Sequence, residues 1–365
     1  MSDKTHLIGL MSGTSLDGID AALVCFDASH PAGCLIETQY DAYPPELSQR
    51  ILALQDTGDD EIHRTAVLAN ELADLYAASV NKLIAKSHIH PTAIACHGQT
   101  IRHRPDASYT IQLVNAARLT EKTLTTVIAD FRSRDIAAGG QGAPLVPAFH
   151  AAAFRRPDLH RVIVNIGGIA NISDLPVEGK ITGFDCGPGI GLLDTWCLTH
   201  TGEPYDKDGA WAAQGEALPK LLTKLLSHPY FKLPPPKSAG REQFNNQWLN
   251  SLLTGNESPV DVQATLVQFT ADSIAQAINT LCTPNVDELY LCGGGVHNQA
   301  LTSALKIALP KLNIQRTDVI GIHADWLEAH AFAWLGWQTL QNLPGNLTEV
   351  TGAEHPCILG AIYPA

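Results

Sequence analysis

The chain has 365 residues, of which 45% are hydrophobic and 17% are charged, a profile typical of a folded protein long enough for two domains. Its formal net charge of -13 at pH 7 argues against non-specific binding to nucleic acid or to an anionic membrane, since such partners need an excess of Lys and Arg. We therefore expect a small-molecule ligand, with any phosphate group held locally.

The eight cysteines occur singly, with no CxxC pair of the kind found in zinc or redox motifs. They are predicted to be buried, reduced thiols. The N-terminal segment lacks the apolar core of a signal peptide, and no apolar run approaches the length of a membrane span. We expect a cytoplasmic protein.

The first predicted elements are two strands, Leu7 to Met11 and Ile19 to Phe26, which flank a loop of small and hydroxyl residues, SGTSLDG. A helical pattern follows from Glu61 to Lys86, and its apolar stripe should cover a sheet. Strands are predicted at TAIACHGQT (92–100), YTIQLV and TTVIADF. The first third is therefore a mixed sheet with helices.

The Gly- and Pro-rich segment RSRDIAAGGQGAPLVPAFH is predicted to cross between domains. A second core opens with a strand, a Gly turn and a strand from Arg161 to Leu175, and it ends near VIGIHAD. Helices are expected at 218–226 and 260–281, and a final helix at 325–341 is expected to pack on the first half. We predict an N-terminal lobe of residues 1–133 plus 326–365 and a C-terminal lobe of residues 134–325.

Three glycine turns stand out: the first loop, the NIGGIAN turn, and CGGGVHN, which follows a strand and precedes a helix. Tight Gly turns expose N–H groups and allow close approach of phosphate oxygens, and hydroxyls add donors. The third turn could carry a base or ribose beside a helix N-terminus. One such turn is more often structural, but three in this order favour a nucleotide. The P-loop and Rossmann fingerprints are missing.

Several carboxylates are candidates for chemistry. Asp185, placed at the end of a short strand in GFDCGPG, either caps a helix that begins near Gly191 or acts as a general base during phosphoryl transfer. Asp17 and Asp20 could orient Mg²⁺ through its waters, with a structural role equally open for Asp20. Glu328 lies on an otherwise apolar helix, either on a solvated face or directed into the cleft.

Polar side chains gather at the end of one predicted strand. His97, Gln99 and Thr100 in CHGQTIRHRP can hydrogen-bond a sugar, whereas spacing makes His97 and His103 poor candidates for a metal. In the next segment, DFRSRD (130–135), an internal ion-pair network is favoured over catalysis.

A set of motifs in one order makes the chain resemble the 1,6-anhydro-N-acetylmuramic acid kinase family. They are MSGTSLDGID, HGQTIRHRP, DFRSRDIAAGGQGAPLVPAFH, NIGGIANIS, GFDCGPG, PPKSAGRE, CGGGVHN and EAHAFAWLG. The resemblance covers nearly the whole chain. It implies an α/β, two-domain actin-like ATPase fold, a duplicated ribonuclease H-like architecture with a nucleotide cleft between the lobes, in the superfamily of actin, hexokinase and heat-shock-chaperone ATPases.

The resemblance also implies residue roles. Asp185 falls at the catalytic base, and Glu328 helps to hold the attacking water. His97, Gln99 and Thr100 are expected to bind the substrate, and Asp17 to hold the metal. The residues expected to contact ATP are Gly13, Thr14, Ser15, Leu16, Asp17, Gly18, Ile19, Asp20, Asn165, Gly167, Gly168, Gly187, Gly293, Gly294, Gly295 and Asn298.

The implied reaction uses ATP and Mg²⁺. Water attacks C1 of the anhydro sugar, O6 leaves toward the γ-phosphoryl group, and N-acetylmuramic acid 6-phosphate and ADP form, within recycling of the cell wall by a homodimer. Two alternatives remain open: another sugar kinase acting on a free hydroxyl, and a non-enzymatic, nucleotide-driven switch. Ile190 and Ala239 depart from the Asn and Thr expected in the family, and both bear on substrate affinity.

Overall fold

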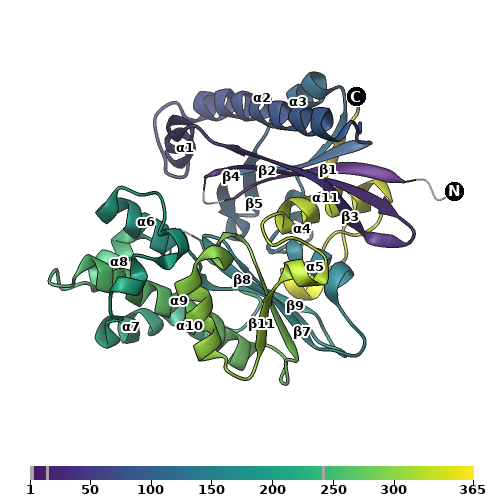
Figure 1. The fold of residues 1–365 in the computed structure, drawn as a ribbon. Coiled ribbons are helices and arrows are strands. Elements are labelled where there is room, and N and C mark those ends of the chain that lie inside the picture. Colours follow the sequence, from purple (N-terminus) through teal and green to yellow (C-terminus); the bar gives the residue numbers. More distant parts are fainter. Residues whose placement is uncertain (1–3, 14–15, 241–242) are drawn as a thin grey trace. The chain divides into compact units, whose positions relative to one another are not determined.

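The structure, a computed structural model, describes residues 4–13, 16–240 and 243–365 (Figure 1). Contacts divide the chain into two units, Met1–Ala153 with Trp326–Ala365, and Phe154–Asp325. The sequence placed these breaks after residues 133 and 325, so the first break lies later in the chain than expected. None of the helices in the described ranges is long and apolar enough to cross a membrane.

The later break has a physical cause in the segment around Asp135. Its carboxylate is fully buried and accepts hydrogen bonds from the side chains of Asn346 (2.6 Å) and Thr351 (2.7 Å) and from the backbone N–H of Gly142 (2.7 Å). The backbone N–H of Gln141 donates to the Thr351 carbonyl at 2.7 Å. These bonds hold the segment in the first unit. At Asp135 they replace the expected ion-pair network with neutral donors.

The first unit contains a seven-stranded mixed sheet in the order β12-β6-β4-β1-β2-β3, with β5 paired to β4. Strand β1 pairs antiparallel with β2 and parallel with β4, and β4 pairs parallel with β6. The strands are β1 (Thr5–Ser12), β2 (Gly18–Asp27), β3 (His30–Ala42), β4 (Ala93–Arg104), β5 (Tyr109–Leu113), β6 (Thr126–Ala129) and β12 (Ala361–Tyr363).

The second unit repeats this plan in a five-stranded sheet of order β11-β10-β7-β8-β9. Strand β7 pairs antiparallel with β8 and parallel with β10, and β10 pairs parallel with β11. Its strands are β7 (Arg161–Ile166), β8 (Ile169–Leu175), β9 (Thr182–Pro188), β10 (Glu288–Cys292) and β11 (Asn313–Arg316). Because order and direction match those of β3-β2-β1-β4-β6, the predicted duplication is confirmed.

The helices connect and cover these strands. In the first unit they are α1 (Pro45–Leu52), α2 (Glu61–Ser87), α3 (Ala116–Thr123), α4 (Ser133–Ala137), α5 (Val146–Phe154), α11 (Leu327–Leu340) and α12 (Thr348–Thr351). In the second they are α6 (Gly191–Thr201), α7 (Pro219–Leu226), α8 (Asn246–Leu252), α9 (Pro259–Leu281) and α10 (Gln299–Ala308).

Two helices cover opposite faces of the first sheet. Ile8 and Leu10 of β1 belong to the apolar core that includes the buried stripe of α2. The alternate residue Gly9 faces α11, because a Cβ there would overlap the carbonyl oxygen of Ala329. The C-terminal helix thus packs on the first half of the chain, as predicted, and Figure 1 shows α2 and α11 on either side of β1.

Candidate functional site

The first glycine loop joins β1 to β2, and polar contacts hold its first end. The Ser12 hydroxyl donates to the Gly98 carbonyl (3.2 Å) and lies 2.7 Å from the Tyr76 hydroxyl. Nε2 of Gln99 donates to the carbonyl of Gly13 at 3.1 Å. The loop therefore leaves β1 tied to β4 and α2.

Its second end is held by β3 and α1. Leu16 has a positive φ of 59°, and its carbonyl accepts a 2.8 Å hydrogen bond from Ser48. The Asp17 carbonyl accepts from the Tyr43 N–H at 2.9 Å, while the Asp17 side chain is exposed. A Cβ at Gly18 would lie 2.5 Å from the Asp41 carbonyl oxygen, so only glycine fits there. The described part of this loop has a fixed backbone and a carboxylate at the surface.

The three polar residues of β4 differ in what they offer a ligand. Gln99 is fully buried, and its Oε1 has no hydrogen-bond partner among the described residues. The Thr100 hydroxyl accepts from Nε2 of Gln112 at 3.2 Å. Gln99 therefore has a buried acceptor that no described residue satisfies, which is rare for a buried polar atom.

His97 accepts hydrogen bonds from a neighbouring arginine. Its Nε2 accepts hydrogen bonds from Nε (3.1 Å) and Nη2 (3.0 Å) of Arg132, and its ring lies against Phe332 with centroids 4.6 Å apart. Burial, together with the Arg132 charge, lowers the pKa of His97 well below its usual value. His97 is therefore neutral and orients the Arg132 guanidinium, a residue the sequence analysis did not single out.

Glu328 occupies the first turn of α11 and is half-buried. A carboxylate there is stabilised by the positive end of the helix dipole. The side chain is thus partly shielded, which excludes a fully solvated face.

In the second unit, the turn between β7 and β8 packs tightly against the turn after β9. The carbonyl of Gly167 accepts from the Ile190 N–H (2.8 Å), and that of Gly168 accepts from the Gly189 N–H (3.0 Å). A Cβ at Gly189 would overlap the Gly167 carbonyl oxygen. The glycines permit this close approach of two backbones. Packing of the two turns therefore requires glycine even without a ligand.

The next polar group lies where β7 meets the third glycine turn. Asn165 is buried, and its Oδ1 has no partner in the described ranges. Gly293 comes directly after β10 and has a φ of 80°, and a Cβ there would overlap Oδ1 of Asn165. A Cβ at Gly295 would overlap the side chain of Ile166. These glycines leave room for Asn165, whose amide oxygen needs a donor such as a bound water or a hydroxyl.

The remaining members of the third turn have separate roles. The Asn298 side chain caps α10 by accepting the Leu301 N–H at 3.0 Å. A Cβ at Gly294 would meet only Cδ1 of Ile190, at 3.5 Å. Gly294 is thus the open member of the turn, and Ile190 is the side chain that borders it.

Asp185 lies within β9, opposite Asn171 of β8, and not at the end of a strand as predicted. Strand pairing continues beyond it through Gly187 and Pro188. Its Oδ2 accepts the Ala239 N–H at 2.9 Å, while α6 has no side-chain cap. The helix-cap alternative is therefore wrong.

A loop from residue 230 to 239 surrounds Asp185. The Tyr230 hydroxyl donates to the Asp185 carbonyl at 2.6 Å, and the Asp185 N–H donates to the Lys237 carbonyl at 3.2 Å. The Lys237 ammonium donates to the Tyr230 carbonyl at 3.3 Å and lies 4.7 Å from the centre of the Tyr230 ring. Backbone and side chain of Asp185 are thus held by one segment.

Lys237 places a buried positive charge beside this carboxylate. It is 9% exposed, and burial lowers its pKa, against the opposing effects of Cys186 and Asp185. Lys237 could not be identified from sequence, because nothing in PPKSAGRE indicates which element the lysine packs against.

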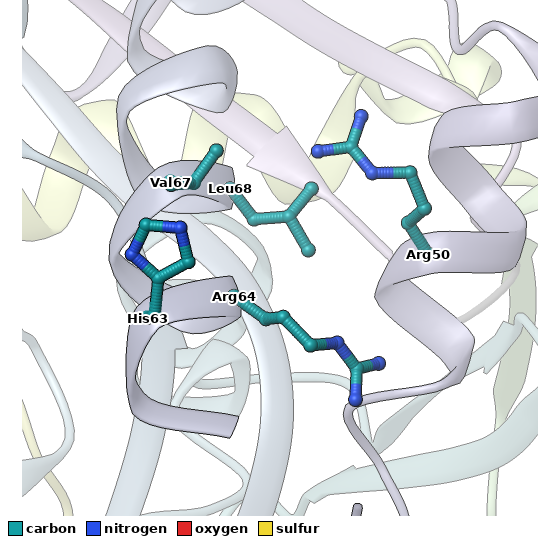
Figure 2. A pocket seen from close by; sticks show the side chains of 5 residues that line it. All are labelled: Arg50, His63, Arg64, Val67 and Leu68. Carbon is teal, nitrogen blue, oxygen red and sulfur yellow. The ribbon is translucent and has the colours of Figure 1, made fainter. Parts of the chain in front are cut away.

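Two observations bear on other sites. Among the described residues, no group of three or more His, Cys, Asp or Glu side chains could hold a metal ion. Residues of α1 and α2 line a hollow with a volume of about 170 Å³ (Figure 2). Its two arginines contact the protein itself: Arg50 pairs with Glu71, and Arg64 donates to backbone carbonyls. The lining residues are Arg50, His63, Arg64, Val67 and Leu68.

The residues expected to contact the nucleotide lie in both units. Thr14 and Ser15 lie outside the described residues. The first loop belongs to the first unit; the other two turns and Asp185 belong to the second. Each unit carries a Gly-containing turn at the same place in the same topology, directly after its first strand. In the described residues the two units therefore share one duplicated α/β topology.

Comparisons with known proteins identify the family. The family model for anhydro-N-acetylmuramic acid kinase matches residues 5–365. Proteins of that name from Nitrosospira multiformis and Neisseria gonorrhoeae are 54% and 47% identical to the chain, over 99% and 100% of both chains. The chain belongs to the anhydro-N-acetylmuramic acid kinase family. It is therefore a phosphotransferase.

Solved structures are more distant. Component A of the Acidaminococcus fermentans (R)-2-hydroxyglutaryl-CoA dehydratase matches with a TM-score of 0.48 and 13% identity, covering 90% of this chain and 96% of that one. A ROK family glucokinase from Streptomyces griseus matches with a TM-score of 0.40 and 10% identity, covering 90% and 97%.

Proposed function

We propose that the protein phosphorylates 1,6-anhydro-N-acetylmuramic acid at O6 with ATP and opens the anhydro bridge by adding water, giving N-acetylmuramic acid 6-phosphate and ADP. The observation that carries this proposal is the match of residues 5–365 to one family, with relatives of one name over their full length. The reaction belongs to cell-wall recycling, and we place it in the cytoplasm.

Asp185 is the general base in this mechanism. It takes a proton from water while the water oxygen bonds to C1 of the sugar. The C1–O6 bond breaks, and O6 keeps the electron pair and attacks the γ-phosphorus, so that the bond from phosphorus to ADP breaks in turn. The bound proton then passes to solvent. The Ala239 N–H on Oδ2 and the nearby Lys237 ammonium support this role, because both favour the carboxylate form.

The glycine turns are proposed to bind the nucleotide. Backbone N–H groups of the first loop and of the Gly167–Gly168 turn would hold phosphate oxygens, and the open Gly294 would lie against the adenosine. The buried Oδ1 of Asn165 would accept from a bound water or a ribose hydroxyl. Gln99, with its unused Oε1, would accept from a sugar hydroxyl.

Magnesium fits the exposed carboxylate of Asp17, since Mg²⁺ on nucleotide phosphates takes oxygen ligands and keeps several waters. The ion would stabilise negative charge on the phosphates. Glu328, partly shielded at the start of α11, is proposed to help orient the attacking water.

The decisive experiment measures ADP release with Mg-ATP, with and without the anhydro sugar, and weighs the sugar product. We expect sugar-dependent ADP and a product heavier by one phosphoryl group and one water. A product heavier by phosphoryl alone from a sugar with a free hydroxyl would indicate another sugar kinase. ADP release that ignores every sugar would favour a nucleotide-driven switch.

We also propose a homodimer, on the family resemblance. Light scattering coupled to size-exclusion chromatography measures the mass directly. A mass equal to that of one chain at micromolar concentration would contradict this proposal.

A further inference from the structure

Two cysteines lie opposite each other on neighbouring strands of the first unit. In the antiparallel pair β2 and β3, Cys25 is the register partner of Cys34. Directly opposite residues present their side chains on the same face, with Cα atoms about 4.5 to 5.5 Å apart. Disulfides join Cα atoms about 4.4 to 6.8 Å apart. We propose that Cys25 and Cys34 form a reversible disulfide, a redox-sensitive modification site in this hairpin.

The two thiols differ in access, which sets the order of reaction. Cys34 is half-buried and can be reached by a small oxidant. Cys25 is 7% exposed, and burial raises its pKa; Lys4 opposes this effect, while Asp27 and Cys34 add to it. Cys34 therefore reacts first, because the thiolate is the nucleophile and must meet the oxidant. Cys25 is the resolving thiol.

A low-molecular-weight disulfide such as oxidised glutathione is the oxidant that we consider. The Cys34 thiolate attacks one of its sulfurs, so its S–S bond breaks and one small thiolate leaves. The Cys25 thiolate then attacks the Cys34 sulfur and displaces the second small thiolate. Two protein thiols are oxidised, one small disulfide is reduced to two thiols, and the two protein protons end on the released thiolates.

The same row of the sheet contains a histidine. His6 of β1 is the register partner of Cys25 on its other side. An imidazole and two thiols thus occupy one row across β1, β2 and β3.

Other cysteines of the described chain lack this arrangement. In the register of the described strands, no other two cysteines are partners. Cys186 and Cys292 are fully buried and donate to the carbonyls of Ala170 and Val164. The pair is therefore specific to the β2–β3 hairpin.

The proposed Cys25–Cys34 disulfide lies on the two strands that contact the end of the first glycine loop. Strand β2 begins at Gly18, the end of that loop, and the Tyr40 hydroxyl of β3 donates to the Asp17 carbonyl at 3.1 Å. A disulfide would join the two strands that hold the loop. It would also close a short ring of backbone, which restricts the unfolded chain.

The test uses the full-length wild-type protein, Cys34→Ser, and Cys197→Ser as the matched control. Cys197 lies elsewhere, 3.3 Å from the Thr201 hydroxyl, a contact that serine can keep, so the control loses one thiol and retains the pair. Each protein is incubated with oxidised glutathione, alkylated, cleaved before aspartate without reduction, and weighed. Asp27 lies between the two cysteines, so cleavage there separates their peptides.

We expect one linked species containing both peptides in wild type and in Cys197→Ser, lost after dithiothreitol and missing in Cys34→Ser. The oxidised wild type should unfold about 5 °C higher than the reduced form, with no such difference in Cys34→Ser. Alkylation of both cysteines, or a glutathione adduct that persists on Cys34, would overturn the proposal. A linked species with an unchanged or lower unfolding temperature would overturn the inference that the native register holds the thiols at bonding distance.

Discussion

Replacing Asp185 by Asn tests the assignment of the general base with little change of shape. The amide oxygen of Asn can still accept the Ala239 N–H, which lies 2.9 Å from Oδ2 in the wild type. The bonds to Tyr230 and Lys237 use the backbone of residue 185, so they survive the change. The fold and the surrounding loop should therefore be preserved.

The chemical loss is large because an amide does not take a proton from water at neutral pH. Loss of a general base costs roughly a hundredfold to ten-thousandfold in rate, which is about 2.7 kcal/mol or more of transition-state stabilisation. The nucleotide binding proposed for the glycine turns does not depend on that proton. We expect kcat to fall at least about a hundredfold while the KM for ATP changes little.

Coupled detection of ADP in the presence of saturating sugar measures both constants. Asp208→Asn is the matched control: the same chemical change at an exposed position of the second unit with φ of 59°, where Asn is tolerated. Near-normal kcat in Asp185→Asn would show that Asp185 is not the general base. A fall matched by the control would point to a general effect of lost charge.

Three further changes test other parts of the argument. Lys237→Met should lower kcat and move the acidic limb of the pH profile to higher pH, because Asp185, the proposed general base, loses the electrostatic interaction with Lys237. It should also stabilise the fold at neutral pH, since burial lowers the lysine pKa. Gly9→Ala should lower the free energy of unfolding by about 3 kcal/mol, measured in urea, because the new Cβ meets the Ala329 carbonyl. Ile190→Asn should change the KM for ATP, and leave the identity of the sugar product unchanged, because Ile190 borders Gly294.

The stability effect of Lys237 has a defined sign with pH. Its pKa is lower in the folded chain than in the unfolded one, so the unfolded chain binds more protons in the range below about 10.5. Wild-type stability therefore rises as pH increases through that range, and Lys237→Met should lack this rise. Stability curves of wild type and Lys237→Met that run parallel with pH would contradict the lowered pKa of Lys237.

A urea midpoint of Gly9→Ala equal to that of the wild type would contradict the close packing of Gly9 on α11. An unchanged KM for ATP in Ile190→Asn would contradict the proposed place of Ile190 beside the nucleotide.

Periodicity alone located the elements that are buried on one side. The hairpin of β1 and β2, the long helix α2 and the helix α9 were all predicted within a few residues, since each has a regular apolar pattern. Strand β3 was missed. Its side chains are mostly half-buried or exposed at the sheet edge, so it carries no clean alternation, and its first residues include a proline and a glycine.

The residues of the candidate site also fall into those that the sequence could predict and those that it could not. Glycine turns and the motif around Asp185 could be found because local sequence determines them. The partners of Asp185 could not, since Tyr230, Lys237 and Ala239 are distant in sequence and reach it through an irregular loop. The strand-end position predicted for Asp185 was wrong for a related reason: an irregularity opposite Ala170 and Asn171 shifts the register, and pairing continues past the expected end.

The duplicated topology explains why the three glycine turns together are stronger evidence for a nucleotide site than any one of them alone. In each unit the first strand lies in the centre of the sheet, between its antiparallel partner and a parallel one, so the turn that leaves it has a fixed place. In the second unit that turn packs on the segment around Gly189. Asp185 lies four residues before Gly189, within β9, which ends at Pro188. One short stretch thus sets both the backbone turn and the carboxylate. A change at Ile190, which follows directly, should therefore alter nucleotide affinity before it alters the chemistry.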